Sequence, residues 1–243
     1  MTDKTFTAAF DGARHTTTLT LTKAESGNRL TGADISALAV AIRDAGQDEK
    51  NKLLVLRAEG DHFCLGRIPD AKGATRPTPL EMRGSVANTI MAFYAAVRNA
   101  PIPVICVAQG EARGFGCAVA AQCDITVASR TALFSLPELD TTIPPTLAMS
   151  ALLQRVPPKT IAHLVYTRQT ITADEARQFG LISQVNERAE LDAAVDRIVA
   201  GLVEKPRGAL TTIKEYLWSA LYVDAGASAH LAQNMISVAM SSF

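Results

Sequence analysis

The sequence predicts an α/β fold, because short apolar runs alternate along the chain with patterns typical of helices. Two of these runs, Leu53–Leu56 and Val104–Val107, are apolar throughout, which is typical of strands buried on both faces of a parallel sheet. After Thr146 the sequence is mostly helical in character, which favours a helical region that follows the α/β core.

The first half of the chain supplies a strand, a capped helix, a buried strand and a second helix. Threonine alternates with leucine from Thr16 to Thr22, which is the period of a half-buried strand. Thr31 or Asp34 can cap the helix that follows. The first apolar run then leads into a loop over 62–66, a proline-rich stretch and a helix over 82–100. The apolar stripe of the capped helix consists of Ile35, Leu38, Ala39 and Ile42.

The second half continues the alternation and ends in helices. A glycine-rich turn over 110–116 follows the second apolar run, and a helix of small residues over 117–122 follows the turn. The remaining expected elements are strands over 125–128, 132–135 and 181–185 and helices over 189–204, 207–221 and 225–240.

The composition is that of a globular protein, with 48% hydrophobic and 20% charged residues in a chain of 243. This length is enough to bury a substantial core. Lysine plus arginine total 24, and aspartate plus glutamate also total 24. The net charge therefore gives no reason to expect a nucleic acid or an anionic membrane as a partner. A few basic side chains or a helix N-terminus can still hold an anionic ligand.

The cysteines and histidines indicate the compartment and argue against a metal site. Cys64, Cys106, Cys117 and Cys123 show no CxxC spacing, and Met1–Phe6 lacks the pattern of a secretory signal. Reduced thiols in a cytoplasmic protein are therefore expected. The histidines form no HxxxH pair, so no metal site is expected. No apolar run approaches the roughly 20 residues that a membrane span needs.

Two glycine-rich turns carry the first functional signal, because each follows an apolar run. They span Phe63–Arg67 and Gly110–Gly116. Parallel strands place such turns at one end of a sheet, where ligands of α/β proteins usually bind. Backbone N–H groups at a helix N-terminus favour negative charge, although glycine turns also connect elements without any other role. The second turn lacks the G-x-G-x-x-G spacing, so a dinucleotide site is not expected.

Four short motifs follow one another along the chain. They are Phe63-x-x-Gly66-Arg67, Gly110-x-Ala112-x-Gly114-Phe115-Gly116, Cys123-Asp124-Ile125 and Phe134-x-x-Pro137-Glu138. In order and spacing they resemble the crotonase (enoyl-CoA hydratase/isomerase) superfamily, and the resemblance runs from about Thr16 to about Ser242. It implies a spiral of repeated ββα units with a core and acyl-CoA site over 1–188. It also implies a C-terminal helical oligomerisation region over 189–243, in a homotrimer or hexamer.

In that family two peptide N–H groups bind the thioester oxygen of an acyl-CoA, and the resemblance assigns them to Arg67 and Phe115. Preorganised donors stabilise the charge that develops on this oxygen in an enolate. The resemblance places the CoA phosphates near Lys23 and Arg29 and the wall of the acyl pocket over 69–84. CoA is part of the substrate, so no separate cofactor is implied. The other residues expected beside the substrate are Cys64, Leu65, Gly66, Ile68, Gly114 and Ala118.

Family hydratases use two glutamates, and this chain has one of them. Glu138 matches the second glutamate, whereas Ala118 occupies the position of the first. One base suffices for a 1,3-proton shift, whereas hydration also requires an oriented water molecule. The sequence therefore favours a Δ3,Δ2-enoyl-CoA isomerase with Glu138 as a single proton shuttle. A hydratase that uses Glu138 alone and a non-catalytic acyl-CoA binder remain alternatives.

Other reactive side chains lie near these motifs. Glu111 and Asp140 could supply a carboxylate, but a solvated loop position for the first and a turn cap for the second are simpler interpretations. Cys64 and Cys117 flank the proposed donors, and a thiol nucleophile there would need an activating base. A small buried core residue is the more common role of cysteine.

Overall fold

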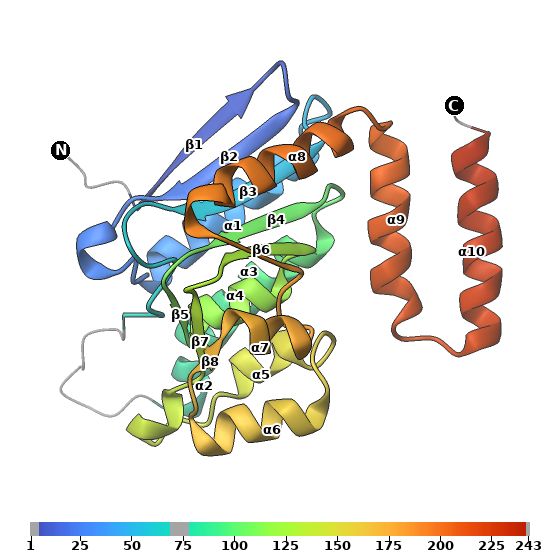
Figure 1. The fold of residues 1–243 in the computed structure, drawn as a ribbon. Coiled ribbons are helices and arrows are strands. Elements are labelled where there is room, and N and C mark those ends of the chain that lie inside the picture. The colour runs from blue at the N-terminus through green and yellow to red at the C-terminus, as the bar shows by residue number, and fades with distance from the viewer. Residues whose placement is uncertain (1–4, 69–77, 242–243) are drawn as a thin grey trace.

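The computed structural model describes residues 5–68 and 78–241 and contains a six-stranded sheet in the order β1-β2-β3-β4-β6-β9 (Figure 1). Neighbouring strands run parallel, except that β1 pairs antiparallel with β2. The α/β class expected from the sequence is therefore confirmed. The strands are β1 (Phe6–Asp11), β2 (Thr16–Leu21), β3 (Leu53–Ala58), β4 (Val104–Ala108), β6 (Ile125–Ser129) and β9 (Gln184–Asn186).

Each face of this sheet has its own apolar cluster, because alternate strand residues point to opposite faces. On β3, Leu54 joins the larger cluster together with residues of α1 (Gly32–Gln47) and α3 (Asn88–Asn99). Val55 faces the other way and joins the cluster formed with α8 (Leu191–Val203). Helices on both faces explain why the central strands are apolar at nearly every position.

A second sheet of three strands, in the order β5-β7-β8, lies beyond the carboxyl end of the first. Its strands are β5 (Glu111–Arg113), β7 (Leu133–Ser135) and β8 (Ile171–Thr172). The sequence indicated only a turn over 110–116, and this interpretation was wrong in the middle of the segment, where β5 pairs parallel with β7. A strand of three residues whose outer two are charged shows no recognisable period.

Helix α1 begins as the sequence predicts. The Oγ1 of Thr31 accepts the N–H of Asp34 at 3.2 Å, and the Asp34 carboxylate accepts the N–H of Thr31 at 2.8 Å. This reciprocal pair satisfies two of the donors that a helix N-terminus leaves free. All of the predicted stripe residues are buried.

The helix expected over 82–100 begins earlier than predicted. Thr78 and Glu81 form a second capping box, with a proline at the first helical position, so that α2 (Pro79–Met82) starts there. A π-type turn over Arg83–Ala87 joins α2 to α3.

The last two helices, α9 (Arg207–Ala220) and α10 (Ala225–Met240), form an arm that extends away from the body of the molecule (Figure 1). Helix α10 packs against α9, and none of its residues is buried. Within the described part of the chain, no helix is long and apolar enough to span a membrane. The remaining α-helices are α4 (Phe115–Gln122), α5 (Thr146–Leu152), α6 (Pro158–Thr167) and α7 (Ala173–Gln178).

A buried ion pair attaches α9 to the body. The Lys214 ammonium lies 2.7 Å from the Asp124 carboxylate and donates to the carbonyl oxygens of Val97 and Ile102 at 2.8 and 3.0 Å. Burial lowers the pKa of Lys214, while Asp124 acts in the opposite direction. Asp124 comes from the Cys123-Asp124-Ile125 motif, which therefore has a structural role at the base of the arm.

Candidate active site

The two glycine-rich turns pair with each other directly. Cys64 forms a parallel bridge with Ala112, and the N–H of Arg113 donates to the Cys64 carbonyl at 2.9 Å. On the other side of the bridge, the N–H of Cys64 donates to the Glu111 carbonyl at 3.3 Å. The structure therefore brings together the two turns that the sequence singled out.

Gly116 allows this close approach. A Cβ atom at Gly116 would lie 2.2 Å from the carbonyl oxygen and 2.9 Å from the Cβ of Cys64. Both atoms belong to Cys64, whose backbone is paired with Ala112. They therefore cannot move aside as the end of a flexible side chain can. Glycine at this position sets the distance between the first turn and the start of α4.

The first proposed donor, the N–H of Arg67, lies on a backbone segment that Leu30 holds on both sides. The N–H of Leu30 donates to the Gly66 carbonyl at 3.1 Å, and the N–H of Ile68 donates to the Leu30 carbonyl at 2.8 Å. In such a parallel bridge the N–H of the middle residue lies on the edge away from the partner strand. The orientation of the Arg67 peptide is thus fixed, with Gly66 at a φ of 99°.

The second proposed donor, the N–H of Phe115, belongs to the first residue of α4. Gly114 precedes it with a φ of 53° and ψ of −115°, which favours glycine. The first N–H groups of a helix have no partner within it, and they favour negative charge. The N–H of Gly114 itself is used, since it donates to the Ser135 carbonyl at 2.9 Å.

The Glu138 carboxyl group lies over this second turn. Glu138 is the first residue of a 3-10 turn (Glu138–Thr141), and a Cβ at Gly114 would lie 2.7 Å from its Oε1. Its Oε2 is buried and has no hydrogen-bond partner within the described residues. Burial raises the pKa of Glu138 above its usual range. A carboxylate in this condition is a stronger base than a solvated one.

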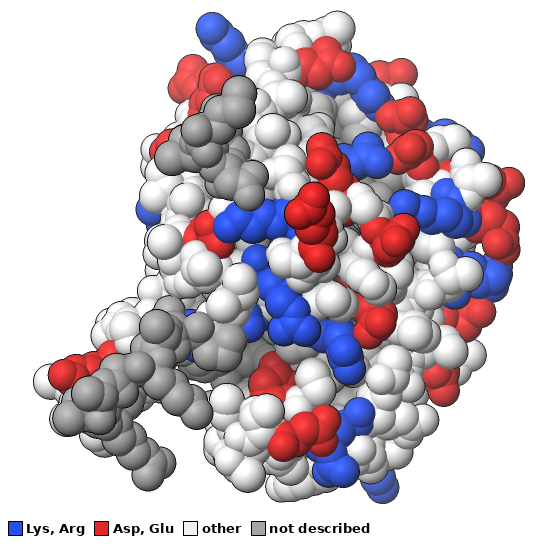
Figure 2. Space-filling model, turned by 90° about the vertical axis from the view of Figure 1, so that its left-hand side faces the viewer, with Lys and Arg blue, Asp and Glu red and all other residues white. Residues whose placement is uncertain are grey.

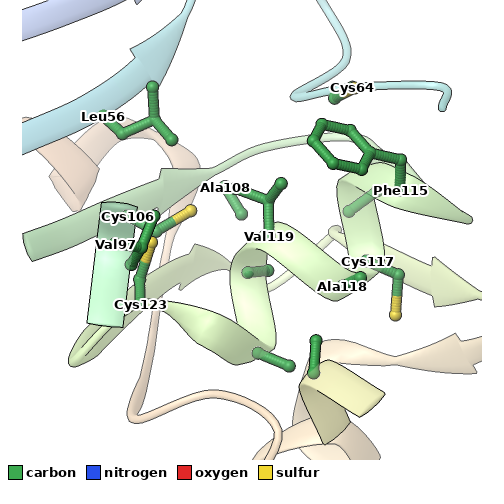
Figure 3. Packing of buried hydrophobic residues seen from close by; sticks show 14 of the residues in the cluster. Leu56, Cys64, Val97, Cys106, Ala108, Phe115, Cys117, Ala118, Val119 and Cys123 are labelled. Carbon is green, nitrogen blue, oxygen red and sulfur yellow. The ribbon is translucent and has the colours of Figure 1, made fainter. Parts of the chain in front are cut away.

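Within residues 5–68 and 78–241, the side chain at position 118 beside the second donor is a methyl group and not a second carboxylate. Ala118 on α4 is fully buried, and Figure 3 shows it on the same helix as Phe115, whose ring lies beside Cys64. Burial raises the pKa of the Cys64 thiol to about 12 and also raises the pKa of Cys117. Both thiols are therefore protonated at neutral pH, which argues against covalent cysteine catalysis.

The other two carboxylates considered from the sequence have partners of their own. Glu111 lies 3.4 Å from the Arg113 guanidinium, and Asp140 lies 2.6 Å from that of Arg168. The Asp140 pair is exposed and links the turn that carries Glu138 to the end of α6. Among residues 5–68 and 78–241, no cluster of His, Cys, Asp and Glu has the arrangement of a metal site.

The residues expected to contact CoA fall into different environments. Lys23 is partly buried in an ion pair with Asp34 at 3.3 Å. Arg29 is exposed and lies close enough to Cys64 to lower the pKa of that thiol, although the opposite effect of burial is larger. Leu65 is half-buried and contacts Gly27, and Ile68 is exposed. Figure 2 shows basic side chains, interspersed with acidic ones, across this side of the molecule.

The expected wall of the acyl pocket over 69–84 is only partly described. Residues 69–77 lie outside the described part of the chain. Residues 78–84 are exposed and form α2 and the start of the π-type turn.

Sequence reasoning missed two aromatic residues of α3 that surround Phe115. The ring centroid of Phe93 lies 5.2 Å from that of Phe115, edge to face, and the Tyr94 ring stacks on it at 6.0 Å. Burial raises the pKa of Tyr94, and Glu138 adds to this effect. The helix itself was predicted, but its pattern does not specify which side chains meet α4.

Comparisons with known proteins agree with the family resemblance of the sequence. The family described as "Enoyl-CoA hydratase/isomerase" matches residues 14–242. A hydrolase of Rhodococcus jostii, named for a methyl-dioxo-hexahydroindene-carboxyl-CoA, is 31% identical over 196 residues, which are 81% of this chain and 74% of the hydrolase. The human mitochondrial enoyl-CoA hydratase domain-containing protein 3 is 29% identical over 91% of this chain and 71% of its own length.

Solved structures show the same relationship. An enoyl-CoA hydratase of Mycobacterium smegmatis has a TM-score of 0.91 at 27% identity, and the match covers 97% of this chain and 91% of that one. A putative enoyl-CoA hydratase of Thermobifida fusca, solved in complex with acetoacetyl-CoA, has a TM-score of 0.86 at 28% identity, with coverage of 99% and 96%. The chain therefore belongs to the enoyl-CoA hydratase/isomerase family of the crotonase superfamily.

Proposed function

We propose that this protein is a Δ3,Δ2-enoyl-CoA isomerase in which Glu138 carries the proton. The observation that supports this most is that the half-buried Glu138 carboxyl group, whose Oε2 is buried, lies over Gly114, while position 118 carries only a buried methyl group. Among the described residues, Glu138 is therefore the candidate base beside the two candidate oxyanion donors. A 1,3-proton shift needs one base that acts twice, whereas hydration also needs help in orienting water.

The reaction follows from this arrangement. The thioester oxygen of a 3-enoyl-CoA accepts hydrogen bonds from the N–H groups of Arg67 and Phe115. Glu138 removes a proton from the α-carbon, and the electron pair of the broken C–H bond delocalises into a dienolate whose charge is greatest on that oxygen. The protonated Glu138 then returns the proton to the γ-carbon, which leaves the double bond conjugated with the thioester. Atoms and charge balance without water or a cofactor.

Binding of the CoA moiety is supported by relatives and by the surface beside the first turn. The Thermobifida fusca relative was solved with acetoacetyl-CoA and, in a second structure, with CoA. Arg29 is exposed next to the first turn and is the better candidate for a phosphate contact. Lys23 already neutralises Asp34, so it contributes less.

A paired assay distinguishes this function from its alternatives. The purified protein is given a 3-enoyl-CoA and, separately, the matching 2-enoyl-CoA, and the absorbance of the conjugated thioester is followed. Isomerisation raises the absorbance in the first reaction, and we expect no comparable fall in the second. A fall at a similar rate would identify a hydratase. Silence in both reactions, with acyl-CoA binding retained, would favour a non-catalytic binder.

The proposed enzyme assembles as a homotrimer or hexamer through the arm. Ile213 and Leu217 on α9 and Leu221 at its C-terminal cap recur every fourth position, and each is more than half exposed. Three large aliphatic side chains in one row are unusual on a surface that faces water. Contact with further copies of the chain would bury them.

Charge on this row is expected to dissociate the oligomer. Replacing Leu217 and Leu221 by Lys places two cations in the contact. Each substitution also removes the roughly 1.5–3 kcal/mol that burial of a leucine side chain contributes. Light scattering should find the wild type at three or six times the protomer mass and the double variant at the protomer mass. Val40→Lys, at an exposed site on α1, is the matched control and should keep the oligomer. A monomeric wild type would contradict the proposed assembly.

A further inference from the structure

His62 connects the two glycine-rich turns through its side chain. The backbone N–H of Glu111, in the second turn, donates to the imidazole Nδ1 of His62 at 3.1 Å. A Cβ atom at Gly110 would lie 3.0 Å from the same nitrogen, so the backbone of the second turn packs directly against the ring. His62 comes immediately before the first turn, Phe63–Arg67. The imidazole therefore joins the segments that carry the two candidate oxyanion donors.

The imidazole takes the place of a backbone acceptor in the parallel ladder between the turns. In this ladder the N–H of Cys64 donates to the Glu111 carbonyl, and the N–H of Arg113 donates to the Cys64 carbonyl. Continued by one step, the ladder would pair the Glu111 N–H with the His62 carbonyl oxygen. That oxygen instead accepts the side-chain amide of Asn28 at 2.8 Å. The side chain of His62 thus supplies the acceptor that its backbone gives to Asn28.

Asn28 is built into the fold for this contact. It is fully buried at a φ of 55°, and its amide also donates to the Glu59 carbonyl at 2.9 Å. Both acceptors belong to the loop between β3 and the first turn. Asn28 therefore holds the loop, and the bond from Glu111 to His62 attaches the end of that loop to the second turn.

The partner of the imidazole decides which ring nitrogen carries the proton. A backbone N–H can only donate, so Nδ1 of His62 must be unprotonated, with the ring proton on Nε2. His15 shows the opposite case, because its Nδ1 lies 3.0 Å from the Lys50 carbonyl oxygen, which can only accept. His15 precedes β2, which runs parallel to β3 and so begins at the end of the sheet away from both turns. It is a matched control within the same chain.

We propose that His62 is a positioning residue of the active site, whose neutral imidazole keeps the two turns at the spacing at which both backbone N–H groups face the thioester oxygen. Gly116 sets how closely the turns can approach, and His62 keeps them from separating. The inference rests on the oxyanion hole of the proposed function and not on the choice between isomerase and hydratase.

The first test is the tautomer of His62. Nitrogen NMR shifts of the imidazole rings report which nitrogen carries the proton when the ring is neutral. The His62 signals are identified by their absence from the spectrum of His62→Asn. We expect them to show a proton on Nε2 and none on Nδ1, and those of His15 to show the reverse. A protonated Nδ1 in His62 refutes the proposal, even if other variants do not fold.

The second test separates positioning from stability. Acetoacetyl-CoA is bound at saturating concentration to the wild type, His62→Leu, His62→Asn and His15→Asn, and the enolate band per bound ligand and the Tm are recorded. Leucine removes the acceptor, whereas asparagine can place its Oδ1 near the position of Nδ1. We expect the band to fall roughly tenfold in His62→Leu, which is less than the cost of losing one donor outright. His62→Asn should restore most of the band, and His15→Asn should match the wild type.

Each other outcome has a definite meaning. If His62→Leu has a lower Tm but the wild-type band at saturation, His62 supports only the fold, and the inference is refuted while the proposed function stands. Equal loss of the band in His62→Leu and His62→Asn also refutes it, because the acceptor would not be what matters. If the wild type binds acetoacetyl-CoA without growth of the band, the oxyanion hole fails and the inference fails with it.

Discussion

Glu138→Gln is expected to lower kcat for isomerisation by roughly 10²–10⁴-fold, which is the usual contribution of a general base. Glutamine keeps the shape of the side chain over Gly114 but cannot accept the α-proton. Glu111→Gln is the matched control, since Glu111 pairs with Arg113 and lies outside the proposed chemistry. Steady-state rates on a 3-enoyl-CoA provide the measurement. Equal losses in the two variants would show that the base is wrongly assigned.

The same substitution has a stability consequence whose sign follows from the pKa of Glu138. Burial raises this pKa in the folded state, so the stability that the group contributes is present at low pH and is lost as the pH rises through the folded-state value. Glu138→Gln should therefore be more stable than the wild type at neutral pH, with the difference shrinking toward acid. Denaturant unfolding of both proteins at neutral and at acidic pH measures this difference in the free energy of unfolding. Activity of the wild type should rise over the same interval, because the base must be ionised to act.

Gly116→Ala is expected to lower kcat by roughly 10²–10³-fold, as does the loss of one oxyanion-hole donor. The added methyl group would lie 2.2 Å from the Cys64 carbonyl oxygen, so the first turn and the start of α4 must separate. This separation changes the position of the Arg67 N–H group relative to the Phe115 N–H group, although neither of these residues is substituted. Stability should fall as well, because the paired backbone between the turns is disturbed.

The control for this prediction is Gly201→Ala. Gly201 lies in α8 with nothing within 4 Å of an added Cβ, so alanine there should leave activity unchanged. It should also stabilise the helix by roughly 0.5–1 kcal/mol. If Gly116→Ala folds and retains full activity, the spacing between the two turns is not what positions the donors.

The central fold could be predicted because burial leaves a direct trace in the sequence. The runs that became β3 and β4 are apolar on both faces, since α8 covers one face and α1 and α3 cover the other. Strand β1 left no such trace, because five of its six residues are exposed. Strand β5 was missed for another reason: it has only three residues, and the outer two are charged, so it shows no recognisable period.

The candidate site could be predicted in part. The motifs indicated Glu138, Arg67 and Phe115, and the structure brings their segments together, while their roles remain predictions. The reason for glycine at position 116 became visible only through its contact with Cys64. Tyr94 could not be found from sequence, because its stacking on Phe115 depends on how α3 packs against α4. Helical periodicity identifies an inward face but not its neighbours.

The most direct test of the central claim, that two backbone N–H groups stabilise a thioester enolate, is the ultraviolet spectrum of bound acetoacetyl-CoA. Preorganised donors favour the charged enolate over the neutral ketone. We predict that the enolate band grows when acetoacetyl-CoA binds the wild type at constant pH, and that it grows much less with Gly116→Ala. Saturable binding by calorimetry with no growth of the enolate band in the wild type would contradict the claim.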